Sequence, residues 1–585
     1  MMYVRPVPSP APNADEASRP IWIDPDPLPD GDPRLHDDPL LHALLSRRVS
    51  GSAAAVEFLD ASPRPAPDPY LLPGMTEAAE RVARALRSGE QIGLFGDYDT
   101  DGVTSAALLT HALRAASGGA QPVAVRLPLR QEGYGLSVVG VEELAADGAS
   151  VLLAVDCGSR DHAAVARARE LGLDVVILDH HRLVEAPPAG AVVASAQLRD
   201  DAPYRALSAA GLSYLLANAL ARQGFDVGDG PGEEPVGLLD LAMIGLVGDV
   251  SSLTGVNRAL VRDGLRQLRA QPRPGLRALL ETAGTDPAKV TSDVVAFQIS
   301  PRLNAPGRLG DPRDAYELLT TWDPRKAARL AEAAQRANQT RKLLLDRVLR
   351  DAEAMLAANP ALLEQRVLVV AGPEWQPGIV GLAASKLAER YDRPAVVLSI
   401  SDDVAHGSAR SVPGFDVTAA LTAASDLLLR HGGHERAAGL ALQTSRLHDL
   451  QAALETAIHA SDAPPPGPPR LLIEAELEPE RFRLDVARLI QTIGPFGEGN
   501  PVPLLRVSRL PIRGYTAMGR EHQHLKLLTD GPAGQVDAIL WGGAGRSREL
   551  VGVRQVDIVG NLETNAWNGS QRVQMKLADF RPADR

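Results

Sequence analysis

Short apolar runs alternate with segments of helical periodicity between about residue 78 and residue 250. After the first run, apolar residues recur at helical spacing from Val103 to Leu113. Near-continuous apolar strands that are separated by helices are typical of a parallel sheet covered on both faces. We therefore predict an α/β domain over residues 46–320, with strands in QIGLFGD (91–97), PVAVRL (122–127), VLLAVD (151–156) and DVVILD (174–179).

A charged segment that is rich in Ala and Leu follows at residues 323–358. Pro324 stands at its start and Pro360 just past its end, which are places where proline is tolerated. A continuous helix over this segment would be roughly 50 Å long, at about 1.5 Å per residue. We predict one connecting helix within residues 321–360; two shorter packed helices are the alternative.

Two further patterns occupy the C-terminal part. RVLVVAG (366–372) and PAVVLSI (394–400), with a helical segment between them, predict a second and smaller α/β domain over residues 361–460. Residues 461–470 form a proline-rich linker. Beyond it, apolar and polar residues alternate in several short segments, which predicts a small β-barrel over residues 471–585.

Composition limits the class of protein. The chain has 585 residues, more than one hydrophobic core normally serves. Ten prolines and an acidic excess in the first 40 residues predict a disordered or loosely packed N-terminus over residues 1–45. The single cysteine, Cys157, excludes an internal disulfide, and no apolar run approaches the roughly 18 residues of a membrane helix. We expect a cytoplasmic protein without a membrane segment.

The net charge of −12 argues against a simple basic coat protein for nucleic acid. Local charge differs from the total, because residues 301–350 contain eleven Lys and Arg against six Asp and Glu. Local positive charge is what attracts phosphates.

Acidic and histidine side chains follow the ends of the predicted strands. Because the carboxyl ends of parallel strands share one edge of the sheet, these side chains should converge there. A further carboxylate, Asp249, ends the apolar segment at residues 237–250; a plain turn aspartate is the alternative reading. The strand-end residues are Asp97, Asp99, Asp156, Asp179, His180 and His181.

Carboxylate and imidazole donors suit Mn²⁺ or Mg²⁺ better than a soft metal. Two such ions, about 3.5–4 Å apart, would clamp the attacking and leaving oxygens of a phosphoester displacement. A single aspartate is a weak signal, because Asp is common in turns and helix caps. The whole set predicts metal-dependent phosphoester chemistry.

These motifs resemble a known family. GDYDTDG (96–102), VDCGS (155–159), LDHH (178–181) and GLVGDV (245–250) resemble, in order and spacing, the four motifs of the DHH phosphoesterases. The resemblance to the RecJ exonucleases within that superfamily extends from about residue 75 to residue 585. It rests on PRLNAPGRL (301–309), ANQTRK (337–342), PGIVGLAASKL (377–387), GSARSVPGFD (407–416) and GGHERAAGL (432–440).

The resemblance implies a DHH domain, a DHHA1 domain and an OB-fold, and it assigns roles to residues. His181 would lie near the scissile phosphate, Asp179 would orient the histidine pair, and Asp101 would shape the first motif and cap its helix. The implied metal ligands are Asp97, Asp99, Asp156, His180 and Asp249, with Asp156 bridging two ions. Thr100 stands where alanine is usual, and Gln376 stands where many relatives have histidine.

Several residues are candidates for binding the substrate. Glycine-rich turns with a cation can clamp a phosphate, which favours Ser408, Arg410, Gly432, Gly433 and His434. In PRLNAPGRL, Arg302, Asn304 and Arg308 either line the path of the DNA or pair with nearby carboxylates such as Asp311 and Asp314. In the barrel, the candidates for base stacking are Tyr515, Trp541 and Trp567, although aromatic residues of a small barrel are often core.

The activity implied by the resemblance is 5′→3′ hydrolysis of single-stranded DNA to 5′-mononucleotides, in repair and recombination. We expect a monomer, and a single-strand-binding protein and a helicase remain open as protein partners. The competing interpretations are a DHH hydrolase of short oligonucleotides, nucleotides or pyrophosphate, and an inactive single-strand-binding scaffold.

Overall fold

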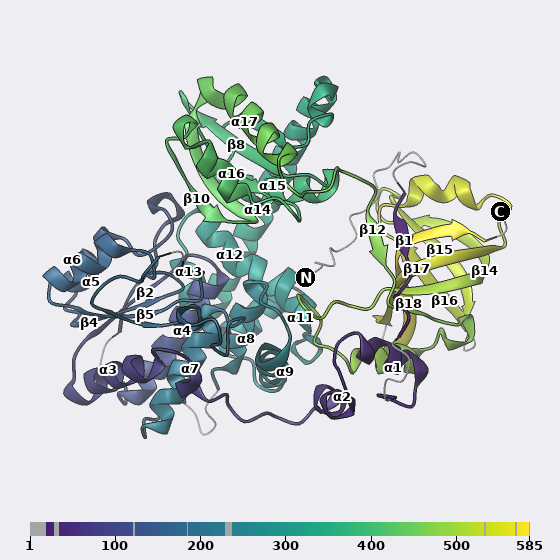
Figure 1. The fold of residues 1–585 in the computed structure, drawn as a ribbon. Helices are drawn as coiled ribbons and strands as arrows, with labels where there is room; N and C mark the ends of the chain where they lie inside the picture. The colour runs from purple at the N-terminus through teal and green to yellow at the C-terminus, as the bar shows by residue number, and fades with distance from the viewer. Residues whose placement is uncertain are drawn as a thin grey trace.

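The computed structural model describes residues 19–28, 34–120, 123–183, 185–228, 237–531, 534–567 and 570–583. Three bodies are visible: a large α/β body, a smaller α/β body above it in Figure 1, and a barrel at the side. Among the described residues, no helix is long and apolar enough to cross a membrane.

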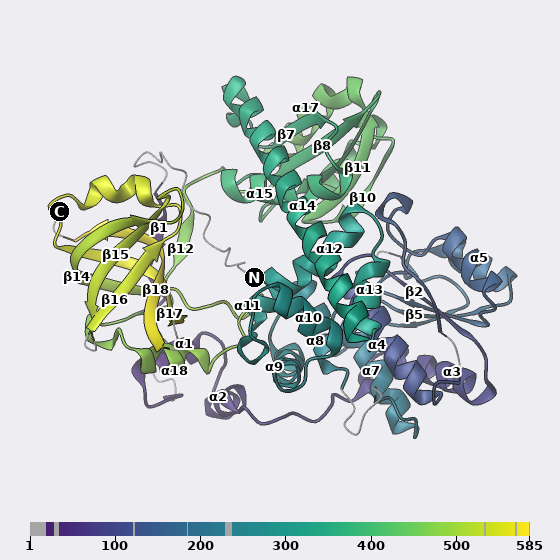
Figure 2. The ribbon, with the colours of Figure 1, turned by 180° about the vertical axis from the view of Figure 1, so that it is seen from behind.

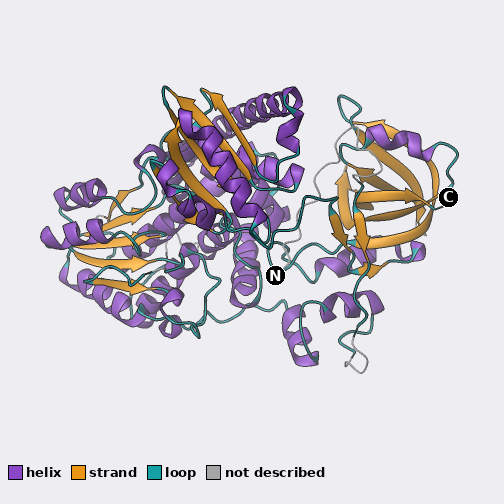
Figure 3. Ribbon diagram, turned by 45° about the horizontal axis from the view of Figure 1, so that its top comes forward, coloured by secondary structure: helices purple, strands orange, loops and turns teal. Residues whose placement is uncertain are grey.

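The large body is built on a five-stranded parallel sheet. Its strand order is β3-β2-β4-β5-β6, and the strands are β2 (Ile92–Gly96), β3 (Val123–Arg126), β4 (Val151–Val155), β5 (Asp174–Leu178) and β6 (Ala191–Ala194). Separate apolar cores lie on its two faces, as the uninterrupted apolar strands predict. One face carries α3 (Met75–Ser88), α4 (Thr100–Ala116) and α7 (Ala209–Arg222), and the other carries α5 (Val138–Ala146) and α6 (His162–Glu170). Figure 3 shows the strands of the large body with helices on both sides.

A helical layer extends the first of these cores. It comprises α8 (Leu239–Gly248), α9 (Gly255–Ala270), α10 (Pro274–Thr282), α11 (Ser292–Val294), the π-helical turn η6 (Val295–Ile299), α12 (Ser300–Leu309) and α13 (Arg313–Thr320).

The connecting helix α14 (Pro324–Ala358) is continuous over 35 residues, which confirms the single-helix prediction. Asp323 caps its N-terminus by accepting a hydrogen bond from the Arg325 amide. Its first half buries alanines in the core of the large body, and its second half buries Val348, Ala352 and Leu356 in a core of the smaller body. The helix therefore belongs to both bodies, as the view from behind shows (Figure 2).

The smaller α/β body has a mixed sheet in which only β7 and β8 pair in parallel. The strand order is β10-β11-β9-β8-β7. Its elements are β7 (Leu368–Pro373), α15 (Pro377–Tyr391), β8 (Ala395–Ser401), β9 (Val404–Arg410), α16 (Val417–Ala423), β10 (Arg430–His434), β11 (Ala437–Gln443) and α17 (Leu447–His459).

The C-terminal body is a closed barrel, as the alternating pattern predicts. Strands follow the order β13-β14-β15-β16-β18-β17, and pairing of β14 with β17 closes the sheet. Its elements are β12 (Arg470–Leu472), β13 (Ala475–Glu476), α18 (Leu484–Gln491), β14 (Leu505–Met518), β15 (His524–Gly531), β16 (Gly534–Leu540), β17 (Gln555–Trp567) and β18 (Ser570–Pro582).

The prediction of a disordered or loosely packed segment at residues 1–45 is wrong for its described part. Strand β1 (Ile21–Ile23) pairs in parallel with β12, and helix α1 (Pro39–Ser46) buries four leucines in the barrel core. The prolines there limit the backbone to extended and turn conformations that the few apolar residues then anchor. Residues 1–18 and 29–33 lie outside the described residues.

Two connections tie the barrel to the large body. After helix α2 (Ser52–Leu59), the chain runs along α9, where Arg258 donates to the Phe58 carbonyl at 3.2 Å. On the barrel side, the loop at residues 493–501 accepts hydrogen bonds from the Leu253 amide and the Ser292 hydroxyl, each at 2.6 Å. The barrel is therefore held to the large body by two parts of the chain, the N-terminal segment after α2 and the loop at residues 493–501.

We predict that Trp22→Phe weakens the anchorage of β1. The Trp22 indole donates a 2.7 Å hydrogen bond to Asp579, a carboxylate that is fully buried in the barrel. Loss of one partner of a buried polar group costs about 1–3 kcal/mol. The denaturant midpoint should fall accordingly, whereas the exposed Tyr515→Phe should leave it unchanged. An unchanged midpoint for Trp22→Phe would contradict the docked position of β1.

Candidate active site

Acidic and histidine side chains from separate elements meet at the carboxyl edge of the parallel sheet. Possible ligand atoms lie within 4.8 Å of one another in three overlapping groups. These groups are Asp97, Asp99 and Asp156; Asp156, His180 and His181; and Asp101, His180 and Asp249. All five residues expected to bind metal are therefore brought together: four follow strands, as strand-end placement predicts, and Asp249 comes from the C-terminal end of α8.

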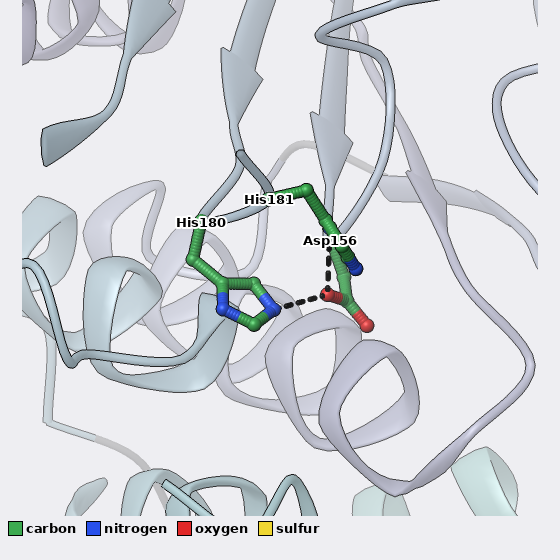
Figure 4. Close-up of side chains that lie close together, drawn as sticks. All are labelled: Asp156, His180 and His181. Atoms are coloured by element: carbon green, nitrogen blue, oxygen red, sulfur yellow. Dashed lines mark ion pairs between the residues drawn. The ribbon is translucent and has the colours of Figure 1, made fainter. Parts of the chain in front are cut away.

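Asp156 lies at the centre of this cluster. Its Oδ1 is 3.3 Å from Nε2 of His180 and 4.0 Å from Nδ1 of His181 (Figure 4). The residue has a φ of +63°, a left-handed conformation that is unusual for a side chain other than glycine. Its carbonyl accepts a 2.9 Å hydrogen bond from the Tyr134 hydroxyl, which stabilises this conformation.

The first motif is shaped by a close approach of two backbone segments. A Cβ atom at Gly102 would lie 2.5 Å from the Asp97 carbonyl oxygen, so only glycine fits there. Asp99 caps α4 by accepting hydrogen bonds from the amides of Asp101 and Gly102. One oxygen of Asp99 thus holds the helix while the other stays available at the site.

The expectation that Asp101 caps the helix of its own motif is wrong. Its carboxylate instead accepts hydrogen bonds from the N-terminus of α7, from Ser208, Ala209 and Ala210 at 2.7–3.0 Å. Asp99 occupies the capping position of α4, and the first turn of that helix directs Asp101 inward. Asp101 therefore joins α7 to the site and lies 3.9 Å from Nε2 of His180.

Burial of like charges dominates the electrostatics. Burial raises the pKa of Asp97 and of Asp156 well above the usual range, and neighbouring carboxylates raise both further. Burial above all, with Asp101 and Asp99, raises the pKa of Asp249 to about 7. Within the described part of the chain, Oδ1 of Asp97, Oδ1 of Asp156 and Nε2 of His180 are buried without a hydrogen-bond partner. Such a site fits divalent cations.

A second set of contacts fixes the orientation of His181. Its Nδ1 is 2.7 Å from Oδ1 of Asp179, and the Tyr134 hydroxyl lies 3.0 Å from the same nitrogen. Burial opposes ionisation of Asp179, but hydrogen bonds from His181 and Ser159 outweigh it and hold the pKa well below the usual range. His434 of the smaller body stacks on His181 with ring centroids 5.5 Å apart. Both α/β bodies therefore contribute to the site.

Four arginines gather beside the acidic cluster. Burial, reinforced by Arg130 and Arg341, lowers the pKa of Arg308 to about 9, and Arg410 acts in the same direction. Burial likewise lowers the pKa of Arg410. Among the described residues, none of the four forms an ion pair with a carboxylate. An arginine group (Arg130, Arg308, Arg341 and Arg410) that is close-set and forms no ion pair within the described residues is suited to an anion such as phosphate.

Comparison with known proteins follows the same division into bodies. The chain matches the family models of the DHH family, N-terminal domain, at residues 91–246, the DHHA1 domain at 364–460 and the RecJ OB domain at 473–579. The single-stranded-DNA-specific exonuclease RecJ of Thermus thermophilus is 35% identical over 512 residues, or 87% of this chain and 71% of that protein. The chain belongs to the RecJ family.

Other RecJ proteins give the same result. RecJ of Bacillus subtilis is 32% identical over 93% of this chain and 68% of its own length, and RecJ of Escherichia coli is 32% identical over 87% and 91%. The crystal structure of Thermus thermophilus RecJ in complex with Mn²⁺ superposes with a TM-score of 0.80 at 31% identity, covering 96% of this chain and 80% of that one.

Within this RecJ framework, two of the candidate substrate residues have internal partners. Arg302 is buried and donates to Gln335 and to the Gln298 carbonyl, at 2.8 and 2.7 Å, so it braces α12 against α14. Asn304 accepts a 2.8 Å hydrogen bond from the Thr100 amide and thereby holds the first motif. Neither role is one of the two that the sequence suggested, because both side chains project from a helix into packed surroundings.

The remaining candidates lie on the smaller body and the barrel. A Cβ atom at Gly381 would lie 3.1 Å from Arg410 and 3.2 Å from Ser408, so these two side chains share one spot beside α15. Gly432 and Gly433 lie on the edge strand β10, just before His434. In the barrel, Tyr515 and Trp541 are 38% and 40% exposed, whereas the Trp567 side chain lies outside the described part.

Sequence reasoning missed Tyr134, Arg130 and Arg341. The first two follow β3, which ends at the same sheet edge as the strands that carry the acids. That loop could have been recognised by its position, since every loop at this edge faces the site. Arg341 was part of the matched ANQTRK segment but had no assigned role.

The metal-free protein should lose stability as the pH rises from about 4 to about 7. A folded-state pKa near 7 for Asp249 means that the folded chain binds a proton that the unfolded chain releases near pH 4. The free energy of unfolding therefore falls across this window. Melting in EDTA should show a drop of several degrees that Asp249→Asn reduces and Mn²⁺ reverses. A flat profile for the wild type would contradict the raised pKa.

Proposed function

We propose that this chain is a single-stranded-DNA-specific exonuclease that hydrolyses phosphodiester bonds with two divalent cations, Mn²⁺ or Mg²⁺. The observation that carries the proposal is the pair of ligand groups that share Asp156, directly beside four arginines that form no ion pair among the described residues. Its relatives are named for that activity, and Thermus thermophilus RecJ has been crystallised with Mn²⁺ and with Mg²⁺.

The donor set would hold two cations. Asp97, Asp99 and Asp156 form one group of three carboxylates. For the second cation we propose Asp156, His180 and Asp249, since Nε2 of His180 is 3.3 Å from Oδ1 of Asp156 and Nδ1 is 3.9 Å from Oδ2 of Asp249. We assign Asp101 to support rather than to metal binding, because both of its oxygens accept hydrogen bonds from α7. Bound ions would generate a nucleophilic hydroxide from water and neutralise charge on the phosphate.

The protein's own residues orient the reacting groups. With Nδ1 held by Asp179, His181 can direct Nε2 toward the phosphate, and Tyr134 limits rotation of the ring. Water attacks phosphorus, a new P–O bond forms, and the bond to the 3′-oxygen of the terminal nucleotide breaks. The leaving oxygen takes a proton, and a 5′-mononucleotide is released. The hydrogen-bond donors of the site are already in place and need little reorganisation, so we expect them to supply most of the stabilisation of the transition state.

The arginine group gives a physical basis for recognition of one end of the strand. Burial lowers the pKa of both Arg308 and Arg410, and a partly buried basic group suits a terminal phosphate because an internal phosphate continues as chain on both sides. This supports the 5′→3′ direction that the family implies. Ser408, beside Arg410, adds a hydroxyl donor, and His434 adds an imidazole from the DHHA1 domain that stacks on His181.

The barrel favours a long polymer over a dinucleotide or pyrophosphate. OB-folds bind single strands through aromatic stacking and backbone contacts, and Tyr515 and Trp541 are exposed enough to take part. We propose that the chain acts as a monomer, because it supplies every residue of the assigned site. Cooperation with a single-strand-binding protein or a helicase, and a cytoplasmic location, stay predictions.

Asp156→Ala should abolish cleavage of single-stranded DNA while the strand still binds. Removal of the shared carboxylate disrupts both cation positions and leaves the arginine group and the barrel in place. Cleavage is measured with Mn²⁺ on a long single strand, a dinucleotide and pyrophosphate, and binding is measured by anisotropy in EDTA. Asp200→Ala, at an exposed surface position, is the control.

Two outcomes would contradict the proposal. A wild type that prefers dinucleotides or pyrophosphate to the long strand would make it another kind of DHH hydrolase. A wild type without any divalent-dependent cleavage would make it a binding scaffold.

Arg410→Ala should raise the KM for a 5′-phosphorylated strand about tenfold or more, because hydrogen bonds to charged groups contribute about 1.5–3 kcal/mol. A strand with a 5′-hydroxyl should be affected much less. Steady-state hydrolysis of both strands by the wild type, Arg410→Ala and Arg446→Ala measures the difference; Arg446 pairs with Asp449 on the surface of the same body. Equal effects on both strands would exclude a terminal-phosphate role for Arg410.

A further inference from the structure

One continuous helical segment leads from the barrel to the acidic cluster. It comprises α11, the turn η6 and α12, over residues 292–309. At its start, the Ser292 hydroxyl donates to the Phe496 carbonyl of the barrel loop at 2.6 Å. Near its end, Asn304 holds the Thr100 amide and Arg308 belongs to the arginine group. The segment therefore borders the barrel at one end and the proposed catalytic site at the other.

Phe297 lies midway along this segment and faces outward. Burial raises the pKa of Asp293, and Lys576 of barrel strand β18 opposes this, so the start of the segment lies near the barrel. Towards its end, Arg308 lies near Asp99 of the acidic cluster. Phe297 is thus the aromatic side chain of a segment that joins both regions.

The exposure of Phe297 is not a result of a loose helix end. Its side chain is 69% exposed, and among the described residues it is the one phenylalanine that is exposed. Its neighbours Val295 and Ile299 are fully buried in the core of the large body, so the backbone on either side is anchored. The segment forms a π-helical turn at residues 295–299, a feature that is frequent at functional sites.

The segment that carries Phe297 lies beside a proposed cation ligand. Turn η6 packs beside the C-terminal end of α8, where a Cβ atom at Gly248 would lie 3.3 Å from the Ser300 hydroxyl. Asp249 follows directly, and then Val250, which is 57% exposed with a φ of +58°. Val250 thus adds an exposed apolar side chain next to Asp249, a proposed cation ligand. A planar base can stack on an exposed aromatic ring, and such stacking is independent of sequence.

We propose that Phe297 stacks on a base of the single strand between the barrel and the catalytic site. The inference rests on the proposed function and adds a specific position to it. Within residues 292–309, Phe297 is the one exposed aromatic residue that a strand crossing from the barrel to the arginine group could meet. Stacking there holds the strand in line while its end is cleaved.

The test combines affinity with a residue-specific crosslink. In EDTA, Phe297→Ala should bind a 20-nucleotide oligothymidylate about fivefold or more weakly than the wild type, since stacking contributes on the order of 1–3 kcal/mol per base. Phe297→Trp should restore the affinity and Phe297→Leu should not, because leucine is apolar without a ring. Tyr70→Ala, at an exposed aromatic residue of the large body that contacts Arg222, is the matched control.

The crosslink locates the contact. Iodouracil is placed at successive positions of the strand, and irradiated adducts are mapped by mass spectrometry. One position should crosslink to Phe297 in the wild type and to the new side chain in Phe297→Tyr, and the adduct should vanish in Phe297→Ala.

Unchanged affinity in Phe297→Ala, equal binding by the Leu and Trp variants, or crosslinks only elsewhere would each overturn the inference. The proposed function is judged separately, by whether the wild type degrades the strand with Mn²⁺. A wild type that degrades the strand while Phe297→Ala binds normally excludes the stacking position and leaves the exonuclease intact.

Discussion

The structure depends on buried carboxylates that cannot all be charged without divalent cations. Burial raises the pKa of Asp97, Asp156 and Asp249, and the negative charge of Asp99 raises the pKa of all three further. The repulsion is a consequence of the fold, because the carboxyl ends of the parallel strands lie at one edge of the sheet and bring the carboxylates together. The same repulsion that destabilises the metal-free chain supplies affinity for hard cations.

Much of the fold followed from pattern, because burial on both faces of a sheet or along a long helix leaves a strong periodic signal. The parallel sheet, the helix from Pro324 and the barrel were all predicted. The N-terminal segment was not, since strand β1 is only three residues long and takes its stability from partners more than 400 residues away. Such a pairing has no local signature.

Residues of the site were predictable where a side chain that can bind metal stands at the end of a predicted strand. Asp97, Asp156 and His180 were found in this way. The roles of Arg302, Asn304 and Asp101 were not, because a charged side chain on a helix can face either a ligand or a neighbouring helix, and only packing decides. Tyr134 was missed because it contributes one hydroxyl group, which donates a hydrogen bond to the backbone carbonyl of Asp156.

Helix α14 has a consequence for how substrates are sorted. Its two halves are buried in two different cores, so one continuous helix sets how far apart the two α/β bodies lie. The spacing between the two α/β bodies then limits the thickness of a strand that can lie between them. A strand would then be admitted according to its thickness. The spacing that decides this is set when the chain folds, so no moving gate is needed.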